Sequence, residues 1–313
     1  MAVTHHDEHF HDHAAMLAMR AALASSASPP LAPESRPGFD DLMAKTPTAA
    51  GVALTPGQVA DVPGWWCRPS TTATQSAILY FHGGAYVLGS AAAFRGLASQ
   101  IACRVGAAVF VADYALAPER PFPAAFNDMQ RAFHGLRRQG FKKVAFAGDS
   151  AGGGLALALL LHPSPERPVA AAVFSPWIDL SLAGTTMETR AGSDPLLSRE
   201  AIASAADQYL NGANPLDPRV CALAGDFASM PPVHIDVGDD EVLLDDSLRF
   251  DELARSAGAA CDVHVWKGMV HVFPSNITML KAAGEALDHA GGFLRKALGT
   301  VNERSHADRG SWQ

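Results

Sequence analysis

The sequence has few of the features that mark disulfide-rich, membrane or nucleic-acid-binding proteins. It contains only four cysteines in 313 residues. They are far apart and form no Cys-x-x-Cys pair, which argues against a disulfide framework or a zinc site and predicts reduced thiols in the cytoplasm. No apolar run is long enough to span a bilayer. The formal net charge of −8 argues against nucleic acid or an anionic membrane as the main partner.

The N-terminal residues have an unusual composition. Residues 1–13 hold five of the 13 histidines, lack a basic n-region and precede a run that Arg20 interrupts, so we expect no secretion signal. Such a tract can bind metal, but we interpret it as an unstructured arm. Residues 14–24 and 39–45 have the composition of helices, and residues 25–37 that of a linker.

From about residue 55, apolar runs of strand type alternate with helical segments. This alternation predicts an α/β fold with a mainly parallel sheet and helices on both faces. Residues 180–215 contain no good strand, and we interpret them as an insertion that joins the N-terminal helices in a helical cap over the carboxyl edge of the sheet, where ligands bind. We therefore expect an arm and part of the cap over 1–50, a catalytic domain over 51–300 and a tail over 301–313. The expected strands are 76–81, 107–112, 143–147, 169–175, 232–237 and 262–266, and the expected helices are 126–138, 151–161, 245–256 and 277–298.

A nucleophile motif occupies residues 148–152 (GDSAG), between the strand 143–147 and an apolar helix. A serine on such a sharp turn has a strained backbone that pushes its Oγ clear of the sheet. Gly148 and Gly152 make room where a Cβ would collide with neighbouring chain. A phosphate-binding turn is the alternative, but a P-loop needs a lysine that is missing here. We predict that Ser150 is the nucleophile.

A second glycine-rich turn, residues 82–85 (HGGA), follows the strand 76–81. Successive glycines turn backbone amides toward one point, as the tetrahedral intermediate of acyl transfer requires. We predict that the amides of Gly83, Gly84 and Ala151 form an oxyanion hole, with His82 hydrogen-bonded to the loop backbone.

A serine nucleophile needs a base and a group that orients the base. Of eight histidines outside the arm, His271 is the best base because it lies on a loop at the carboxyl edge, whereas His264 lies inside a strand and is interpreted as structural. Three carboxylates at 239–241 follow the strand 232–237, and spacing does not choose among them. Asp245 and its neighbour are expected to begin the next helix. The other histidines in predicted elements are His134, His162, His234 and His289.

Five motifs occur together in the chain: HGGA at 82–85, DYALAPE at 113–119, GDSAGG at 148–153, GDDEVLLDD at 238–246 and GMVHVF at 268–273. Their combination is more specific than any single motif. With these motifs the chain resembles the bacterial hormone-sensitive-lipase-like (type IV) carboxylesterases of the α/β-hydrolase superfamily, and is most similar to the subgroup with monoterpene ε-lactone hydrolase. The resemblance covers about residues 50–298.

The resemblance implies that the acid is the Asp of a Gly-x-Asp-Glu/Pro run, here Asp240, and it supports Ser150 and His271. It also implies an N-terminal cap, frequent homodimers and no metal or organic cofactor. The usual fourth residue of the first motif is glycine, and we expect an ordinary φ for Ala85, which replaces it.

The predicted activity is the hydrolysis of short- to medium-chain esters through an acyl-enzyme on Ser150. Lactone, amide or formamide hydrolysis on the same residues is the first alternative. A ligand-binding receptor on an inactive hydrolase is the second, and the presence of His271 argues against it. The pocket should be apolar, although core packing is an equal interpretation of its aromatic candidates. These candidates are Tyr86, Trp65, Trp66 and Phe94.

Overall fold

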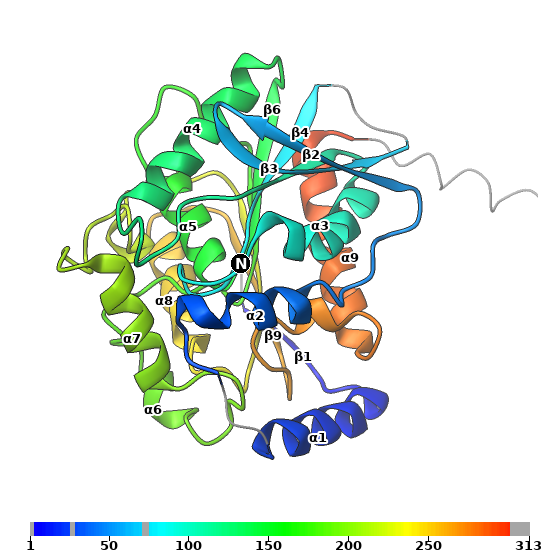
Figure 1. Cartoon of the computed structure of the whole chain (residues 1–313), viewed down its shortest axis with the longest axis vertical. Coiled ribbons are helices and arrows are strands. Elements are labelled where there is room, and N and C mark those ends of the chain that lie inside the picture. Colours follow the sequence, from blue (N-terminus) through cyan, green and yellow to red (C-terminus); the bar gives the residue numbers. More distant parts are fainter. Residues whose placement is uncertain (1–2, 26–28, 71–74, 301–313) are drawn as a thin grey trace, which may run out of the picture.

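The computed structural model describes residues 3–25, 29–70 and 75–300. Within these residues a nine-stranded sheet runs through the middle of the protein (Figure 1). The strands are β1 (Thr4–His6), β2 (Val52–Val59), β3 (Val62–Pro69), β4 (Ser76–Phe81), β5 (Ala108–Ala112), β6 (Lys143–Asp149), β7 (Ala171–Phe174), β8 (Val233–Gly238) and β9 (Cys261–Trp266). The α-helices are α1 (Phe10–Ala24), α2 (Arg36–Met43), α3 (Ala91–Val105), α4 (Ala124–Arg138), α5 (Ser150–Leu161), α6 (Thr186–Thr189), α7 (Arg199–Leu210), α8 (Leu244–Ser256) and α9 (Lys281–Leu298).

The strand order is β1-β9-β8-β7-β6-β4-β5-β3-β2. Along this order, the strands from β1 across the sheet to β5 all pair in parallel. The remaining two pairings, of β3 with β5 and of β2 with β3, are antiparallel. The predicted α/β-hydrolase fold with a mainly parallel sheet is confirmed. The six expected strands correspond to β4–β9, with ends that differ by two residues at most.

Both faces of the sheet are covered by helices because the central strands are apolar on both sides. In β4, Ile78 and Tyr80 pack with α3 and α9, whereas Leu79 and Phe81 pack with α4, α5 and α8. All four side chains are fully buried. This is the pattern expected for parallel strands, which read as continuous apolar runs rather than as alternating ones.

Three elements between residues 50 and 106 were not predicted, namely β2, β3 and α3. β2 and β3 form a hairpin at one sheet edge, where the exposed β2 carries Pro56 and Gly57 and so lacks a clear strand pattern. α3 did leave a signal in the sequence. Ser90 caps its N-terminus by accepting from the Ala93 amide, and Gly106 ends it in the left-handed conformation.

The N-terminal tract is not an unstructured arm, so that prediction was wrong. Residues 4–6 form β1, which pairs in parallel with β9 and adds a strand at the edge of the sheet. The buried Asp12 of α1 accepts hydrogen bonds from the Lys281 and Ala282 amides, both at 2.8 Å, at the start of α9. His and Asp side chains, which composition alone assigns to disorder, here form specific contacts with the folded body.

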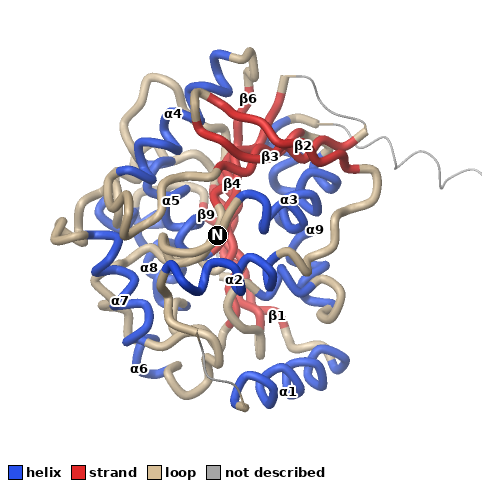
Figure 2. The backbone as a smooth tube through the Cα atoms, in the orientation of Figure 1, coloured by secondary structure: helices blue, strands red, loops and turns tan. Residues whose placement is uncertain are grey.

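The two predicted cap segments meet. Arg20 of α1 donates to the carbonyl of Ser193, and Gln208 of α7 donates to the carbonyl of Leu31 at 2.9 Å. Both α6 and α1 lie toward the lower end of the view in Figure 2. No strand forms in residues 180–215, as expected. The proposed division into arm, catalytic domain and tail stays a prediction, and residues 301–313 lie outside the described part.

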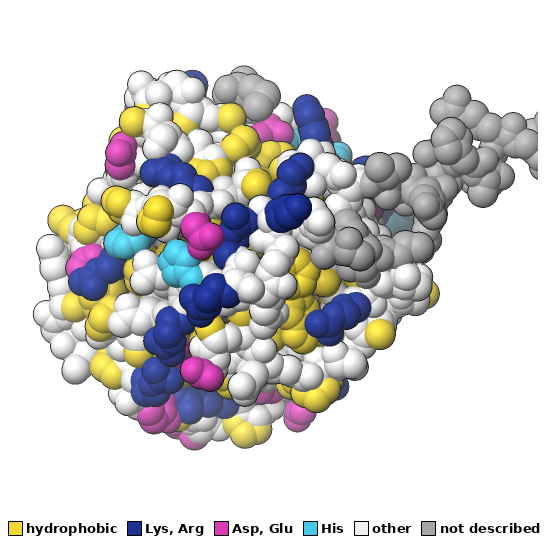
Figure 3. All heavy atoms as spheres, turned by 90° about the horizontal axis from the view of Figure 1, so that it is seen from above, with side chains coloured by type: hydrophobic (Ala, Val, Ile, Leu, Met, Phe, Trp, Pro, Cys, Tyr) yellow, Lys and Arg dark blue, Asp and Glu magenta, His cyan; other side chains and the backbone are white. Residues whose placement is uncertain are grey.

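Figure 3 shows one face of the molecule, on which basic, acidic and apolar side chains are interspersed. In the described part of the chain, no helix combines the length and apolar character needed to cross a membrane.

We expect Asp12→Ala to lower the free energy of unfolding by about 1–3 kcal/mol, because two amides at the start of α9 lose their acceptor. Urea unfolding of the whole chain measures this change. Asp7→Ala, at an exposed position of the same tract, is the control and should stay near the native value. Equal stabilities of the two variants would show that the docking of α1 through Asp12 does not stabilise the fold.

Candidate active site

Ser150 lies on the sharp turn where β6 ends and α5 begins. Its φ of +53° places a non-glycine residue in the left-handed region, as predicted for the nucleophile turn. A Cβ at Gly152 would collide with the carbonyl oxygens of Phe81 and His82, so only glycine allows β4 to approach the turn this closely. The local sequence therefore fixes the position of the Ser150 hydroxyl.

The structure brings His271 to Ser150. The Nε2 atom of His271 lies 2.8 Å from Ser150 Oγ, and its Nδ1 atom lies 2.8 Å from the Oε2 atom of Glu241. Because a carboxylate accepts, Nδ1–H donates to Glu241, which leaves Nε2 to accept from the Ser150 hydroxyl. These three side chains form the hydrogen-bonded catalytic triad of a serine hydrolase.

Asp240, the acid that the resemblance implied, does not contact His271, so this prediction was wrong; the residue after it, Glu241, does. Its carboxylate forms an ion pair with Arg20 of α1, and its side chain is 23% exposed, whereas that of Glu241 is fully buried. Asp239 is also engaged elsewhere, since it accepts from the Gly268 amide at 2.7 Å. Each of the three consecutive carboxylates therefore has a separate partner, and only Glu241 contacts His271.

The carboxylate of Glu241 is held from several directions. Its Oε1 atom accepts from the Gly238 amide and from the Ser175 hydroxyl, both at 2.6 Å. The Ser175 oxygen in turn accepts from the Val272 amide at 3.0 Å. The network links the ends of β7 and β8 with the loop that carries His271, so a rigid acceptor faces the imidazole.

The direction of Glu241 depends on the turn after β8. The amides of Asp239 and Asp240 bond the carbonyls of Trp266 and Met269, at 3.0 and 3.4 Å, which folds the chain back over the loop after β9. This turn aims the third carboxylate inward and the second outward. Both bonds join segments that are distant in sequence, so the spacing of the residues carried no signal for this choice.

Burial tends to lower the pKa of His271, but the hydrogen bond and the charge of Glu241 outweigh it and raise this pKa above its ordinary value. A raised pKa makes the imidazole a stronger base. It also means that the neutral form needed to accept the serine proton is lost earlier as the pH falls.

The glycine-rich loop before α3 uses its amides differently from the prediction. The Gly83 amide donates to the Asp149 carboxylate at 3.1 Å, so this donor is already engaged. Within the described residues, the amides of Gly84 and Ala85 donate to no protein acceptor. Ala151 is the second residue of α5, where a helix offers no acceptor for the amide. Three amides on two neighbouring turns are thus free to bind a ligand oxygen.

The loop backbone is strained at the position of the missing third glycine. Ala85 has a φ of +55° and the next residue, Tyr86, a φ of +63°. The expected ordinary φ of Ala85 was therefore wrong. Left-handed conformations at two consecutive non-glycine residues are energetically unfavourable, and such strain is common at functional sites.

Asp149 is a buried carboxylate that the sequence analysis left without a role. It accepts from the Tyr80 hydroxyl at 2.7 Å and from the Gly83 amide, and it has no cationic partner among the described residues. Burial raises its pKa to about 7. Its position directly before Ser150 allows one side chain to connect the nucleophile turn with the loop at residues 82–85.

His82 makes the contact predicted for it. Its Nδ1 atom lies 2.8 Å from the carbonyl oxygen of Gly83, and its ring stacks on Tyr114 with centroids 4.3 Å apart. Tyr114 donates a hydrogen bond to the carbonyl of His82 at 2.5 Å. The motif at residues 113–119 therefore packs against the loop at residues 82–85 and holds it in place.

Of the four aromatic pocket candidates, three pack in the core. Trp66 contacts Phe110 and also Phe141, which precedes β6 at the opposite end of the strand from Ser150. The ring of Trp65 lies under the Arg95 guanidinium on the α3 face, and Phe94 lies against His82. These three positions correspond to the core-packing interpretation.

Tyr86 is the candidate that stays near the nucleophile. Its ring stacks on Tyr209 of α7 at 3.8 Å and lies 6.0 Å from Trp177. The Trp177 amide bonds the carbonyl of Ser150 at 2.9 Å, so the aromatic group adjoins the nucleophile turn. The hydroxyls of Tyr86 and Tyr209 are buried and have no partner among the described residues.

Comparison with known proteins agrees with this geometry. Residues 78–275 match the sequence family described as having the alpha/beta hydrolase fold. The chain belongs to the α/β-hydrolase family. It is 37% identical over 256 residues to an acetyl-hydrolase of Streptomyces hygroscopicus, a match that covers 79% of this chain and 85% of the relative. An esterase of Acinetobacter venetianus is 36% identical, with 82% and 87% covered.

Solved structures of α/β-hydrolases superpose closely on the chain. The crystal structure of EstE5 soaked by ethyl alcohol gives a TM-score of 0.85 at 35% identity and covers 91% of this chain and 98% of its own. An esterase of the bacterial hormone-sensitive lipase family gives 0.86 at 33% identity, with 92% and 98% covered.

We expect Glu241→Gln to lower kcat about 10³- to 10⁴-fold, because the amide neither orients the imidazole correctly nor stabilises the imidazolium. Asp240→Asn is the matched control and should keep kcat within about tenfold, since it changes only a half-buried ion pair. Steady-state kinetics on an aryl ester measures both. If Asp240→Asn lowered kcat more than Glu241→Gln, Asp240 would be the acid instead of Glu241.

The same pair of variants has a distinct pH signature. Native activity should fall on the acid side around an apparent pKa above the ordinary histidine value, because protonated His271 accepts no proton. Glu241→Gln should move this limb to lower pH and Asp240→Asn should leave it near the native position. If the acid side of the pH–activity profile of Glu241→Gln stayed at the native position, Glu241 would not set the pKa of His271.

We expect Asp149→Ala to lower kcat about 10- to 100-fold, because the Gly83 amide and the Tyr80 hydroxyl lose a buried acceptor and the loop shifts. Asp149→Asn keeps an acceptor oxygen and should retain most activity. Kinetics and thermal unfolding of both variants check this. Equal losses in the two variants would mean that the carboxylate acts through its charge and not through this contact.

Proposed function

We propose that the chain is a serine carboxylesterase that hydrolyses short- to medium-chain esters. The observation that carries the proposal is the line from Ser150 through His271 to the buried Glu241, with both hydrogen bonds at 2.8 Å. Relatives named esterase and acetyl-hydrolase support the same reaction class. A complete hydrogen-bonded triad argues against a receptor built on an inactive scaffold.

In the acylation step, Ser150 Oγ attacks the ester carbonyl carbon while His271 Nε2 takes its proton. The carbonyl oxygen becomes an oxyanion, and the amides of Gly84, Ala85 and Ala151 donate to it. Glu241 stabilises the imidazolium that forms. His271 then gives the proton to the leaving alcohol oxygen, and the C–O bond breaks to leave an acyl-enzyme.

In the deacylation step, a water replaces the alcohol. His271 takes a proton from the water as its oxygen attacks the acyl carbon, and the second oxyanion uses the same three amides. Collapse of this intermediate releases the carboxylic acid and returns the proton to Ser150 Oγ. Every proton in the cycle passes through Nε2 of His271, which is why the fixed tautomer matters.

The substrate range is proposed from the surroundings of Ser150. The Tyr86–Tyr209 stack and Trp177 give the nucleophile an apolar, aromatic neighbourhood. Ser150 itself is only 9% exposed, which favours compact acyl groups. Similarity to the monoterpene ε-lactone hydrolase subgroup stays a prediction, as do a homodimer and a cytoplasmic location. The last is supported by the buried thiols of Cys67, Cys221 and Cys261.

We expect Ser150→Ala to abolish ester hydrolysis by several orders of magnitude and to leave the fold intact, because the nucleophile is lost without a change of packing. Activity is measured on aryl esters of rising acyl length beside several lactones, and folding is measured by circular dichroism. A fluorophosphonate probe should label the native chain at Ser150 and leave the variant unlabelled.

The panel also separates the alternatives. Turnover of lactones well above that of the aryl esters would replace the esterase by a lactonase on the same triad. Folded Ser150→Ala with most of the native activity would remove Ser150 from the mechanism. A native chain that the probe does not label would favour the receptor.

A further inference from the structure

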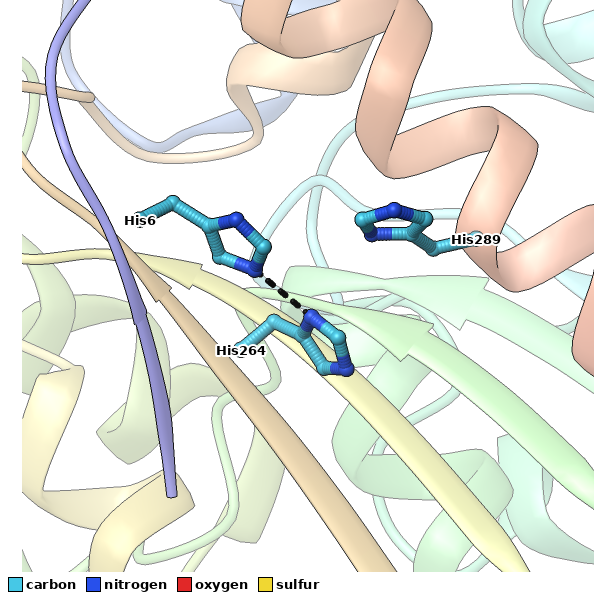
Figure 4. Close-up of side chains that lie close together, drawn as sticks. All are labelled: His6, His264 and His289. Atoms are coloured by element: carbon cyan, nitrogen blue, oxygen red, sulfur yellow. Dashed lines mark hydrogen bonds between the residues drawn. The ribbon is translucent and has the colours of Figure 1, made fainter.

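Three histidines from three elements come together beside the edge of the sheet (Figure 4). His6 belongs to β1, His264 to the neighbouring β9 and His289 to α9. His6 lies in the N-terminal tract that composition assigned to disorder. His264 and His289 are two of the histidines that the catalytic mechanism does not use.

The centroids of the three rings have the spacing of imidazoles around a tetrahedral metal ion. The ring centroids are 5.0 Å apart for His6 and His264, 5.2 Å for His264 and His289, and 5.5 Å for His6 and His289. With Zn–N bonds of about 2.0–2.1 Å, a tetrahedral ion holds imidazole centroids about 5 Å apart and their nitrogens about 3.4 Å apart. One nitrogen of each ring lies within 4.8 Å of the others.

The surroundings prepare His264 to act as a ligand. Its Nδ1 atom faces His6 Nε2 at 2.7 Å, and its Nε2 atom lies 3.3 Å from the Asp262 carboxylate. A carboxylate on the far nitrogen of a histidine is the usual support of a metal ligand, because it fixes the tautomer that leaves the near nitrogen unprotonated. Asp262 therefore directs the lone pair of Nδ1 toward the space between the rings.

His6 is held in place by stacking. Its ring lies parallel to the Trp266 ring with centroids 3.9 Å apart. In the absence of an ion, His6 Nε2–H donates to His264. A tautomer change that moves this proton to Nδ1 frees Nε2 for a metal without the loss of a proton.

We propose that His6, His264 and His289 form a binding site for a divalent transition-metal cation of the zinc type. Neutral imidazoles select zinc, nickel, copper or cobalt over calcium and magnesium, which prefer oxygen ligands. His289 is exposed, so an ion enters from solvent and a water completes its coordination. The site shares no residue with the catalytic triad of Ser150, His271 and Glu241.

Such an ion would fasten the N-terminal strand to the body of the protein. β1 is only three residues long, and its neighbour α1 carries Arg20, which pairs with Asp240 beside the acid of the active site. A metal bridge between β1, β9 and α9 adds three bonds where β1 pairs with β9 over three residues. We therefore expect the metal to stabilise the fold rather than to take part in ester hydrolysis.

Zinc titration of the full-length, tag-free chain tests the proposal. Calorimetry with ZnCl₂ should give one site per chain, and Co²⁺ should give the visible absorption of a tetrahedral complex. His289→Ala should weaken Zn²⁺ binding at least tenfold and remove the rise in Tm that Zn²⁺ gives the native chain. Because His289 is exposed, this variant should fold and retain esterase activity.

His11→Ala is the matched control, since His11 is an exposed histidine of the same tract outside the cluster. It should bind Zn²⁺ like the native chain, and His6→Ala should resemble His289→Ala. The proposal is overturned if the native chain binds no Zn²⁺, or if His289→Ala and His6→Ala bind it as well as the native chain does. It is also overturned if only His11→Ala loses binding, because the metal would then be held by the tract itself.

Discussion

The carboxylate of Glu241 is fully buried, and its burial requires that every lone pair facing the protein finds a donor. Gly238, Ser175 and His271 provide these donors from three separate segments at the carboxyl edge of the sheet. The position of the imidazole follows from this constraint, and with it the distance to Ser150. The active site is thus the place where a buried charge is satisfied by groups that only the assembled sheet brings together.

A second buried carboxylate repeats the principle on the other side of the nucleophile. Among the residues that the structure describes, Asp149 forms no ion pair, and it is stabilised by the Tyr80 hydroxyl and the Gly83 amide. The pair of acids therefore fixes the two sides of the reaction centre. Glu241 positions the base, whereas Asp149 positions the loop whose remaining amides face the ligand oxygen. The strain at Ala85 and at Ser150 is tolerated because these contacts hold both turns in place.

The N-terminal segment connects the sheet edge with the active site. Asp12 caps α9, Arg20 pairs with Asp240, and His6 lies against His264 and Trp266. These contacts use polar and charged side chains at half-buried positions, where each partner satisfies the other. A segment with little apolar surface is thereby ordered without a core of its own. The same polar composition supplies the imidazoles of the proposed metal site.

The sequence by itself determined the six strands β4–β9, the nucleophile Ser150 and the base His271. These features are local, because a glycine-flanked turn, an apolar strand and a loop at a strand end are all visible in a short window. Tertiary structure decided which of three consecutive carboxylates meets the base, and which loop amides stay free. It also decided that the histidine-rich tract joins the sheet. Each of these choices rests on hydrogen bonds between segments far apart in the chain, so the spacing of residues and the composition do not predict them.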